Sequence, residues 1–292
     1  MRKYKSMIAI LAACLLLFSG CVSSDGKGED SQSSASSQSS EVSQSTPSSQ
    51  EEDSQASQSS ESSTESSESA AENSENSEAT QSTSGPVETS FFDDAVFIGD
   101  SVSLRLTLYC QSHPGALGKA QFLTSGSLGS GNALEKVTSD SVHPYYQGEH
   151  MSVEDGVKAS GAKKVFIMLG MNDVGLYGVD DSVKNMETLI QRILDKSPDA
   201  EIYLQSMTPI LTGHERKVLN NENLDKYNAK LKELAKEKGY HFADVASVMK
   251  QEDGSLKPEY CSDGGEDGMG IHFTDAGAEA WIDYLLQNAN SF

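Results

Sequence analysis

Two side chains far apart in the sequence, Ser101 and His272, have the types and settings that nucleophilic catalysis requires. Ser101 follows a short apolar segment and opens an amphipathic one, so we expect it where a strand turns into a helix. A serine hydroxyl is a weak nucleophile at neutral pH and needs a base to take its proton. Among six histidines, His272 fits this role best because it lies between a glycine-rich loop and the last amphipathic segment. The pair predicts acyl transfer through a serine.

A tetrahedral intermediate also needs hydrogen-bond donors for its oxyanion, and three positions could supply them. The backbone N–H of Ser101 would stand at a helix start, where N–H groups lack helical partners and the dipole favours an anion. Asn172 could donate from its side chain, and Gly129 from its backbone. Each also has a simpler structural interpretation. Ser101 could cap its helix, Asn172 and Asp173 could form a turn, and the glycine-rich stretch around Gly129 could be a flexible loop.

The elements that must position these side chains alternate between short apolar and longer amphipathic segments. We predict strands at 95–98, 121–123, 163–169, 201–207 and 240–245, and helices at 101–110, 152–160, 180–196, 222–238 and 274–288. This alternation predicts an α/β fold with a mainly parallel sheet covered on both faces. Ligands of such sheets bind beyond the carboxyl ends of the strands, where Ser101, Gly129 and Asn172 would meet in one site.

Four short motifs occur in an order that resembles the SGNH/GDSL hydrolase family. They are Ile-Gly-Asp-Ser at 98–101, Gly-Ser-Leu-Gly at 126–129, Gly-Met-Asn-Asp at 170–173 and the segment around His272. The resemblance covers residues 91–292. It implies a flavodoxin-like three-layer α/β/α fold, hydrolysis of small ester groups, and no metal or organic cofactor.

The resemblance also implies the roles of individual residues. Ser101 would be the nucleophile and His272 the base, and the oxyanion hole would contain Ser101, Gly129 and Asn172. Gly126 is the alternative to Gly129, and the Gly-x-x-Gly pattern favours the later glycine.

The acid that orients His272 is where this sequence departs from the family pattern. The family places an aspartate three residues before the histidine, and Met269 stands there. We expect Asp267 to take this role, with Asp263 as the alternative, because the surrounding glycines could let the loop bulge. A backbone carbonyl could also serve, which would leave a Ser–His dyad.

The first 90 residues predict export and tethering. Residues 1–21 combine a basic start with a short apolar run and end in a sequence that resembles a bacterial lipobox, so we expect a signal peptide that ends at a lipidated Cys21. Residues 22–90 are rich in Ser and Glu and poor in apolar side chains, which predicts a disordered acidic tether. The expected location is the outer face of a bacterial cell membrane. An ordinary signal peptide with an incidental cysteine is the alternative.

Charge and location narrow the expected partners of the domain at 91–292. It contains 30 acidic and 18 basic residues, which argues against binding nucleic acid. We expect the substrate to be a small, acetyl-type ester, which could sit on a glycan, where Tyr145 and Tyr146 could stack on a sugar or simply pack on the core. Acyl transfer to a sugar, or a non-catalytic glycan- or wall-binding role, are the alternatives. Whether Cys110 and Cys261 form a disulfide stays open.

Overall fold

The computed structural model of this protein describes residues 88–292. The expected signal peptide, the lipidation site at Cys21 and nearly all of the expected tether lie outside the described residues. The described part begins with a 3-10 helix, η1 (Thr89–Phe92), which spans the expected domain start at residue 91 and buries Phe92. None of the helices in residues 88–292 is long and apolar enough to cross a membrane.

Parallel strands form the central sheet, in the order β2 (Gln121–Thr124), β1 (Ala95–Gly99), β5 (Lys164–Met168), β6 (Glu201–Gln205) and β7 (His241–Ala243). Every neighbouring pair is parallel. The chain enters at β1, adds β2 on one side, and then adds β5, β6 and β7 on the other, as in flavodoxin-like sheets. The direction reverses between β1 and β5, so the carboxyl ends of these two strands mark the expected ligand site.

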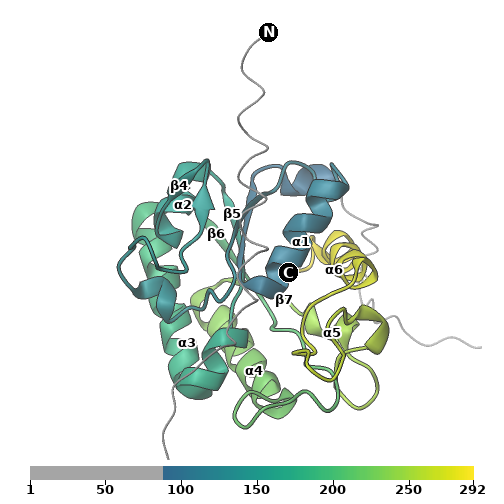
Figure 1. Ribbon diagram of the computed structural model, residues 1–292. Helices are drawn as coiled ribbons and strands as arrows, with labels where there is room; N and C mark the ends of the chain where they lie inside the picture. Colours follow the sequence, from purple (N-terminus) through teal and green to yellow (C-terminus); the bar gives the residue numbers. More distant parts are fainter. Residues whose placement is uncertain (1–87) are drawn as a thin grey trace, which may run out of the picture. The chain divides into compact units, whose positions relative to one another are not determined.

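Helices cover both faces of this sheet, which gives residues 88–292 three layers (Figure 1). One layer contains α2 (Val153–Ser160), α3 (Met171–Lys196) and α4 (Asn221–Lys238). The other contains α1 (Ser101–Ser112), the short α5 (Ala246–Met249) and α6 (Asp275–Asn288). Two more 3-10 helices, η2 (Asn132–Leu134) and η3 (Pro258–Tyr260), lie in the connections. The predicted flavodoxin-like α/β/α fold is thus confirmed.

The inner strands are apolar along their length because helices cover both of their faces. All of β1 is buried, and so is β5 after its first residue. One row of rings crosses the sheet at a single register, formed by Phe122, Phe97, Phe166, Tyr203 and His241. The rings of Phe97 and Phe166 stack 4.6 Å apart, and those of Phe166 and Tyr203 stack 4.4 Å apart. Such cross-strand contacts stabilise the pairing of neighbouring strands.

The largest difference from the predicted elements concerns α3. We predicted a helix over 180–196, but α3 begins at Met171, directly after β5. Gly170 permits this sharp entry, since its φ of 151° favours glycine and a Cβ there would lie 2.5 Å from the Tyr227 ring. Gly178, with φ 75° and ψ 174°, breaks the helical geometry and separates the predicted part of α3 from its unpredicted start.

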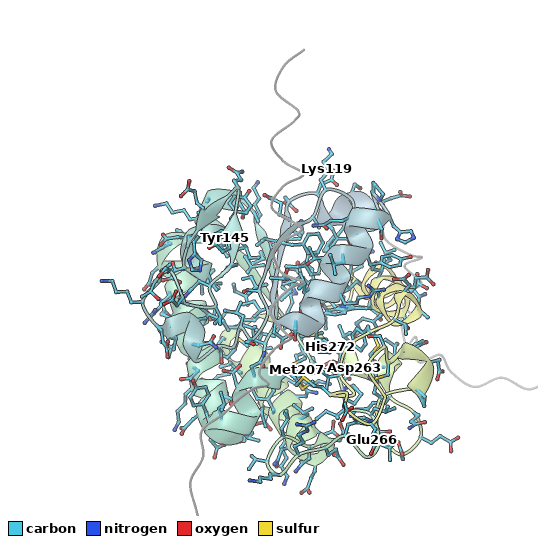
Figure 2. The ribbon with its side chains drawn as sticks, in the orientation of Figure 1. Lys119, Tyr145, Met207, Asp263, Glu266 and His272 are labelled. Carbon is cyan, nitrogen blue, oxygen red and sulfur yellow. The ribbon has the colours of Figure 1, made fainter. Side chains whose placement is uncertain are left out.

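The connection between η2 and α2 contains a small hairpin, β3 (Tyr145–Tyr146) and β4 (Glu149–His150). The Tyr146 hydroxyl donates to Gln121 at the amino end of β2, and the exposed Tyr145 ring stacks on His150. Figure 2 shows Tyr145 well away from His272. Tyr146 packs against the hydrophobic core, whereas Tyr145 is exposed, and contact of either ring with a sugar stays a prediction.

The two cysteines of the described part are not paired. Cys110 lies in α1 and Cys261 follows η3, and both are free thiols. Burial raises the pKa of each thiol to about 11. The disulfide that the sequence left open is therefore not formed, and neither thiol has the lowered pKa of a reactive cysteine.

Candidate active site

Ser101, His272 and Asp263 form a hydrogen-bonded chain of side chains. Ser101 Oγ lies 3.0 Å from Nε2 of His272, and Nδ1 of the same ring lies 2.7 Å from Oδ2 of Asp263. The fold brings the serine and the histidine together across 171 positions of sequence. The side chains of His272 and Asp263 are 30% and 23% exposed, so solvent and substrate can reach the chain. A hydroxyl, an imidazole and a carboxylate in this order can generate a serine nucleophile.

The turn between β1 and α1 presents Ser101. Asp100 is the N-cap of α1, and its Oδ1 accepts the N–H of Val102 at 2.9 Å. Ser101 is therefore the first residue of the helix and not its cap, so its hydroxyl can bond to His272. Its backbone N–H belongs to the first turn, where N–H groups have no partner within the helix. The positive end of α1 thus lies at the candidate nucleophile.

Asp263 organises the loop that carries His272. Its carboxylate accepts the backbone N–H groups of Met269, Ile271 and His272 at 3.3, 3.0 and 3.0 Å, besides the bond to the imidazole. Burial acts to raise the pKa of Asp263, but the hydrogen bonds from the ring and backbone of His272 outweigh it and the pKa is lowered. Asp263 is thus ionised at neutral pH and can stabilise an imidazolium. Figure 2 shows it beside His272.

The expectation that Asp267 orients His272 is corrected by this geometry, since Asp263, the alternative, contacts the ring. The chain folds back on itself here: Ser262 N–H donates to the carbonyl of His272 at 2.8 Å, and Cys261 pairs with Phe273. Position 262 therefore lies opposite position 272, and Asp263 is the next residue along the chain. Asp267 is exposed at the tip of the same loop. Pairing across the loop, rather than closeness in sequence, decides which acid meets the histidine.

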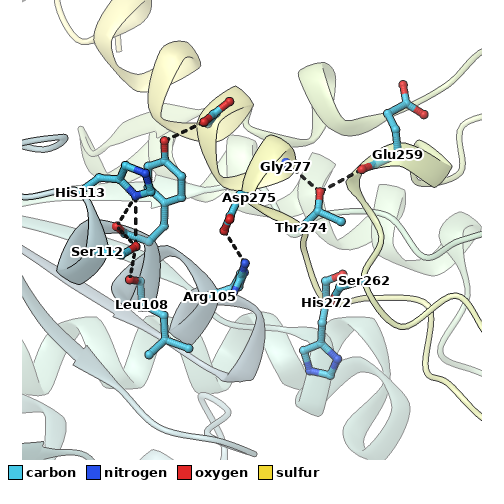
Figure 3. A network of polar contacts seen from close by, with 12 residues as sticks. Arg105, Leu108, Ser112, His113, Glu259, Ser262, His272, Thr274, Asp275 and Gly277 are labelled. Atoms are coloured by element: carbon cyan, nitrogen blue, oxygen red, sulfur yellow. Dashed lines mark hydrogen bonds and ion pairs between the residues drawn. The ribbon is translucent and has the colours of Figure 1, made fainter.

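Contacts between α1 and α6 fix the spacing of the nucleophile and the base. Arg105, about one turn after Ser101, forms an ion pair with Asp275 in the first turn of α6. Thr274 caps α6 with its hydroxyl, and His272 stands just before this cap. Figure 3 shows this network with His272 beside it. The packing of the two helices thus carries the base to the start of α1.

Asn172 lies in the first turn of α3, next to the residue that precedes the nucleophile. Its Nδ2 donates to the carbonyl of Leu128 at 3.0 Å and makes a longer contact of 3.4 Å with Oδ2 of Asp100. One amide proton is thus well held, and the other is held weakly. The weakly held proton leaves Asn172 a donor for an oxyanion formed at Ser101, and its place in the oxyanion hole stays a prediction.

Gly129 differs from the expectation, because its backbone N–H is already engaged. It donates to Oδ1 of Asn132 at 2.8 Å. Asn132 is the first residue of η2, and its side chain reaches back to a backbone N–H that the turn itself leaves unpaired. A Cβ at Gly126, the alternative glycine, would meet nothing within 4 Å. Gly129 thus directly follows Leu128, whose carbonyl accepts the Asn172 amide. The backbone N–H of Gly129, however, already donates to Asn132.

A buried carboxylate holds this loop in place. Asp173 accepts the N–H groups of Ser130 and Gly131 at 2.9 Å each, and it is completely buried. Burial raises its pKa, which the two backbone N–H groups partly offset. From the sequence, Asp173 had no predicted role beyond a turn. Its position directly after Asn172, just beyond the end of a strand, was the one feature of the sequence that could have indicated a role in the site.

Asp100 is a second buried carboxyl group beneath the site, and its role was also missed. Burial raises its pKa to about 7, although the N–H groups of Val102 and Ser103 act in the opposite direction and the charge of Asp173 adds to the rise. It therefore titrates close to neutral pH. Only its ionised form competes strongly for the Asn172 amide proton.

These side chains can carry out acyl chemistry together. Ser101 can attack a carbonyl carbon while His272 takes its proton and later protonates the leaving group. Asn172 and the N–H of Ser101 can stabilise the oxyanion. Within residues 88–292, no cluster of three or more His, Cys, Asp or Glu side chains is arranged to hold a metal ion.

The fold and this constellation define an α/β protein whose serine, histidine and aspartate are in contact at the carboxyl edge of a parallel sheet. The chain belongs to the GDSL-like lipase/acylhydrolase family, whose sequence model matches residues 125–280. The resemblance noted from the short motifs is thus confirmed. The matched range includes Asn172 and His272, and Ser101 lies before it.

Solved structures of bacterial proteins share this fold. A protein from Streptococcus pneumonia, described provisionally as a platelet activating factor, is 25% identical, with a TM-score of 0.50, over 70% of this chain and 85% of that one. A protein from Bacteroides fragilis, described provisionally as an acylhydrolase, is 19% identical, with a TM-score of 0.50, over 67% of this chain and 86% of that one. A search of curated proteins gives no match.

Proposed function

We propose that this protein is a serine esterase that hydrolyses small acyl esters. The observation that carries the proposal is the contact of Ser101 with His272 at 3.0 Å, with Asp263 at 2.7 Å behind the imidazole. His272 removes the Ser101 proton, and the serine oxygen bonds to the ester carbonyl carbon. His272 then gives the proton to the leaving alcohol, and water, activated by the same imidazole, releases the acid and restores the serine.

Hydrolysis of p-nitrophenyl acetate by the full chain tests this proposal. Ser101→Ala should lower kcat by about 10⁴-fold or more, because the covalent step is lost. Ser112→Ala is the matched control, since it removes a hydroxyl from the other end of the same helix and should leave kcat within about twofold. Equal activity in wild type and Ser101→Ala would defeat the proposal.

The proposed natural substrate is an acetyl ester on a glycan, met at the outer face of a bacterial membrane. Support comes from the lipobox-like sequence before Cys21 and the acidic domain, which does not suit an anionic lipid surface or nucleic acid. Incubation with a panel of acetylated polysaccharides should release acetate with wild type but not with Ser101→Ala. Free acetate, rather than acetate moved to an added sugar, distinguishes hydrolysis from acyl transfer.

The proposed anchor is a lipid on Cys21. Cells that express the full chain and are fed a labelled fatty acid should incorporate label into the wild type and not into Cys21→Ser. A Cys21→Ser chain that still carries label and stays in the membrane fraction would remove this part of the proposal.

A further inference from the structure

The Asn132 side chain accepts a hydrogen bond from the backbone N–H of Gly129, the donor that the family resemblance assigns to the oxyanion hole. The Gly129 N–H donates to Oδ1 of Asn132 at 2.8 Å, and the Asn132 amide donates to the carbonyl of Ser127 at 2.9 Å. One side chain thus spans two backbone groups of the same loop. Ser127 has φ of 62°, a left-handed conformation that is unfavourable for a residue with a Cβ and that this bond helps to hold.

The backbone of the loop is held by other contacts. Asp173 binds the N–H groups of Ser130 and Gly131, and Leu128 is fully buried and accepts the Asn172 amide through its carbonyl. None of these bonds involves the Asn132 side chain. Asn132 is half-buried, so its side chain can turn towards solvent while the backbone of Gly129 stays in place.

Chemistry determines which acceptor the Gly129 N–H prefers at each stage of the proposed reaction. An amide oxygen such as Oδ1 of Asn132 is a better acceptor than the carbonyl oxygen of an ester. A full negative charge on the tetrahedral intermediate makes a stronger acceptor than either. The Gly129 N–H would therefore stay with Asn132 in the substrate complex and change partner only as the oxyanion forms, which is the condition for accelerating the chemical step.

We infer that Asn132 is a positioning residue that withholds the Gly129 N–H at rest and gives it up to the oxyanion. The inference rests on the proposed esterase function. It makes Gly129 a donor in the transition state alone, and it predicts that the strength of the acceptor at position 132 sets kcat while KM changes little.

Two variants test this with p-nitrophenyl acetate. Asn132→Ala removes the competing acceptor and should raise kcat about fivefold, the equivalent of one ordinary hydrogen bond. Asn132→Asp places a charged acceptor beside the same N–H and should lower kcat by about tenfold at pH 8. Expressed as the ratio of wild-type to variant kcat at each pH, that loss should disappear when the new carboxyl group is protonated near pH 4, a pH dependence that a purely structural role would not produce.

Asn220→Ala is the matched control. Asn220 makes the same kind of clamp at the start of α4, since it accepts the N–H of Asn223 at 2.8 Å and donates to the carbonyl of Lys217 at 2.7 Å. Its loss should lower the melting temperature without raising kcat. Melting curves of both Asn132 variants show whether the loop persists.

Three results would overturn the inference. Asn132→Ala with kcat at or below wild type is the first, and Asn132→Asp with kcat equal to wild type is the second, which applies even if the alanine variant unfolds. The third is a rise in kcat with Asn220→Ala equal to that with Asn132→Ala. A wild type no faster than Ser101→Ala is a different failure, because it removes the proposed function and the inference with it.

Discussion

The two halves of the candidate site are held in different ways. Ser101 and Asn172 stand at the ends of β1 and β5, which are paired along their whole length inside the sheet. His272 stands on a loop whose shape depends on one carboxylate, that of Asp263, which binds three backbone N–H groups and the ring. The position of Ser101 and Asn172 should therefore survive the loss of a single side chain. In the loop half, one substitution at Asp263 should both displace His272 and remove the carboxylate that contacts its ring.

The halves also respond to pH in opposite directions. Asp100, in the strand-end half, has a raised pKa, and Asp263, in the loop half, has a lowered one. A carboxyl group with a raised pKa destabilises the fold as pH rises, and one with a lowered pKa destabilises it as pH falls. Substitutions and changes of pH should therefore affect the two halves differently.

The largest effect is expected from Asp263→Asn. An amide cannot stabilise the imidazolium and favours the wrong tautomer, so kcat should fall by about 10⁴-fold. Steady-state kinetics on p-nitrophenyl acetate measure this, with Asp267→Asn as the matched control in the same loop, expected within about twofold of wild type. If Asp267→Asn lost activity and Asp263→Asn kept it, the acid would be the one that the sequence first favoured.

Asp100→Asn should change how stability depends on pH. The folded-state pKa of Asp100 is about 7 against an ordinary value of 3.8. The folded state therefore binds the proton more tightly, and wild type should lose on the order of 4 kcal/mol of stability as pH rises from 4 to 8. Asparagine mimics the protonated group, so the variant should lack this loss. Denaturant unfolding at several pH values measures it, and equal slopes for both proteins would contradict the prediction.

Asn172→Ala should slow turnover and leave the fold intact. Loss of one oxyanion donor lowers kcat by about 10²–10³-fold. The melting temperature should change little, because β5 and α3 hold the position. Asn185→Ala, further along α3, is the control and should behave as wild type. An Asn172→Ala enzyme with normal kcat would remove Asn172 from the oxyanion hole.

The smallest effect is expected from Gly268→Ala in the loop half. A Cβ there would lie 1.7 Å from the carbonyl oxygen of Asp263, so the loop must shift. A displacement of the base by about 1 Å would cost up to about 100-fold in kcat. Gly265→Ala meets nothing within 4 Å and serves as the matched control. Equal kcat in both variants would show that the loop half is less sensitive than the comparison implies.

Most of the strand-end half could be predicted from the sequence, because local patterns of apolar and polar residues determine where its strands end. An apolar run followed by Gly-Asp-Ser predicts both the strand β1 and the position of Ser101 at the helix start, and the same reasoning places Asn172 after β5. The prediction missed the start of α3, where Gly170 precedes the helix and Gly178 interrupts its geometry, because glycines are typical of turns rather than of helix interiors.

The sequence alone determined the alternation of strands and helices, and with it the edge at which Ser101 and Asn172 meet, because hydrophobic periodicity is a local property of the chain. Only the tertiary structure decided that Asp263 rather than Asp267 meets His272, and that Asn132 holds the Gly129 N–H. These contacts depend on how a glycine-rich loop folds back and on where one side chain turns. Loops of this kind have no periodic pattern, and their geometry is set by hydrogen bonds to groups that the sequence does not place.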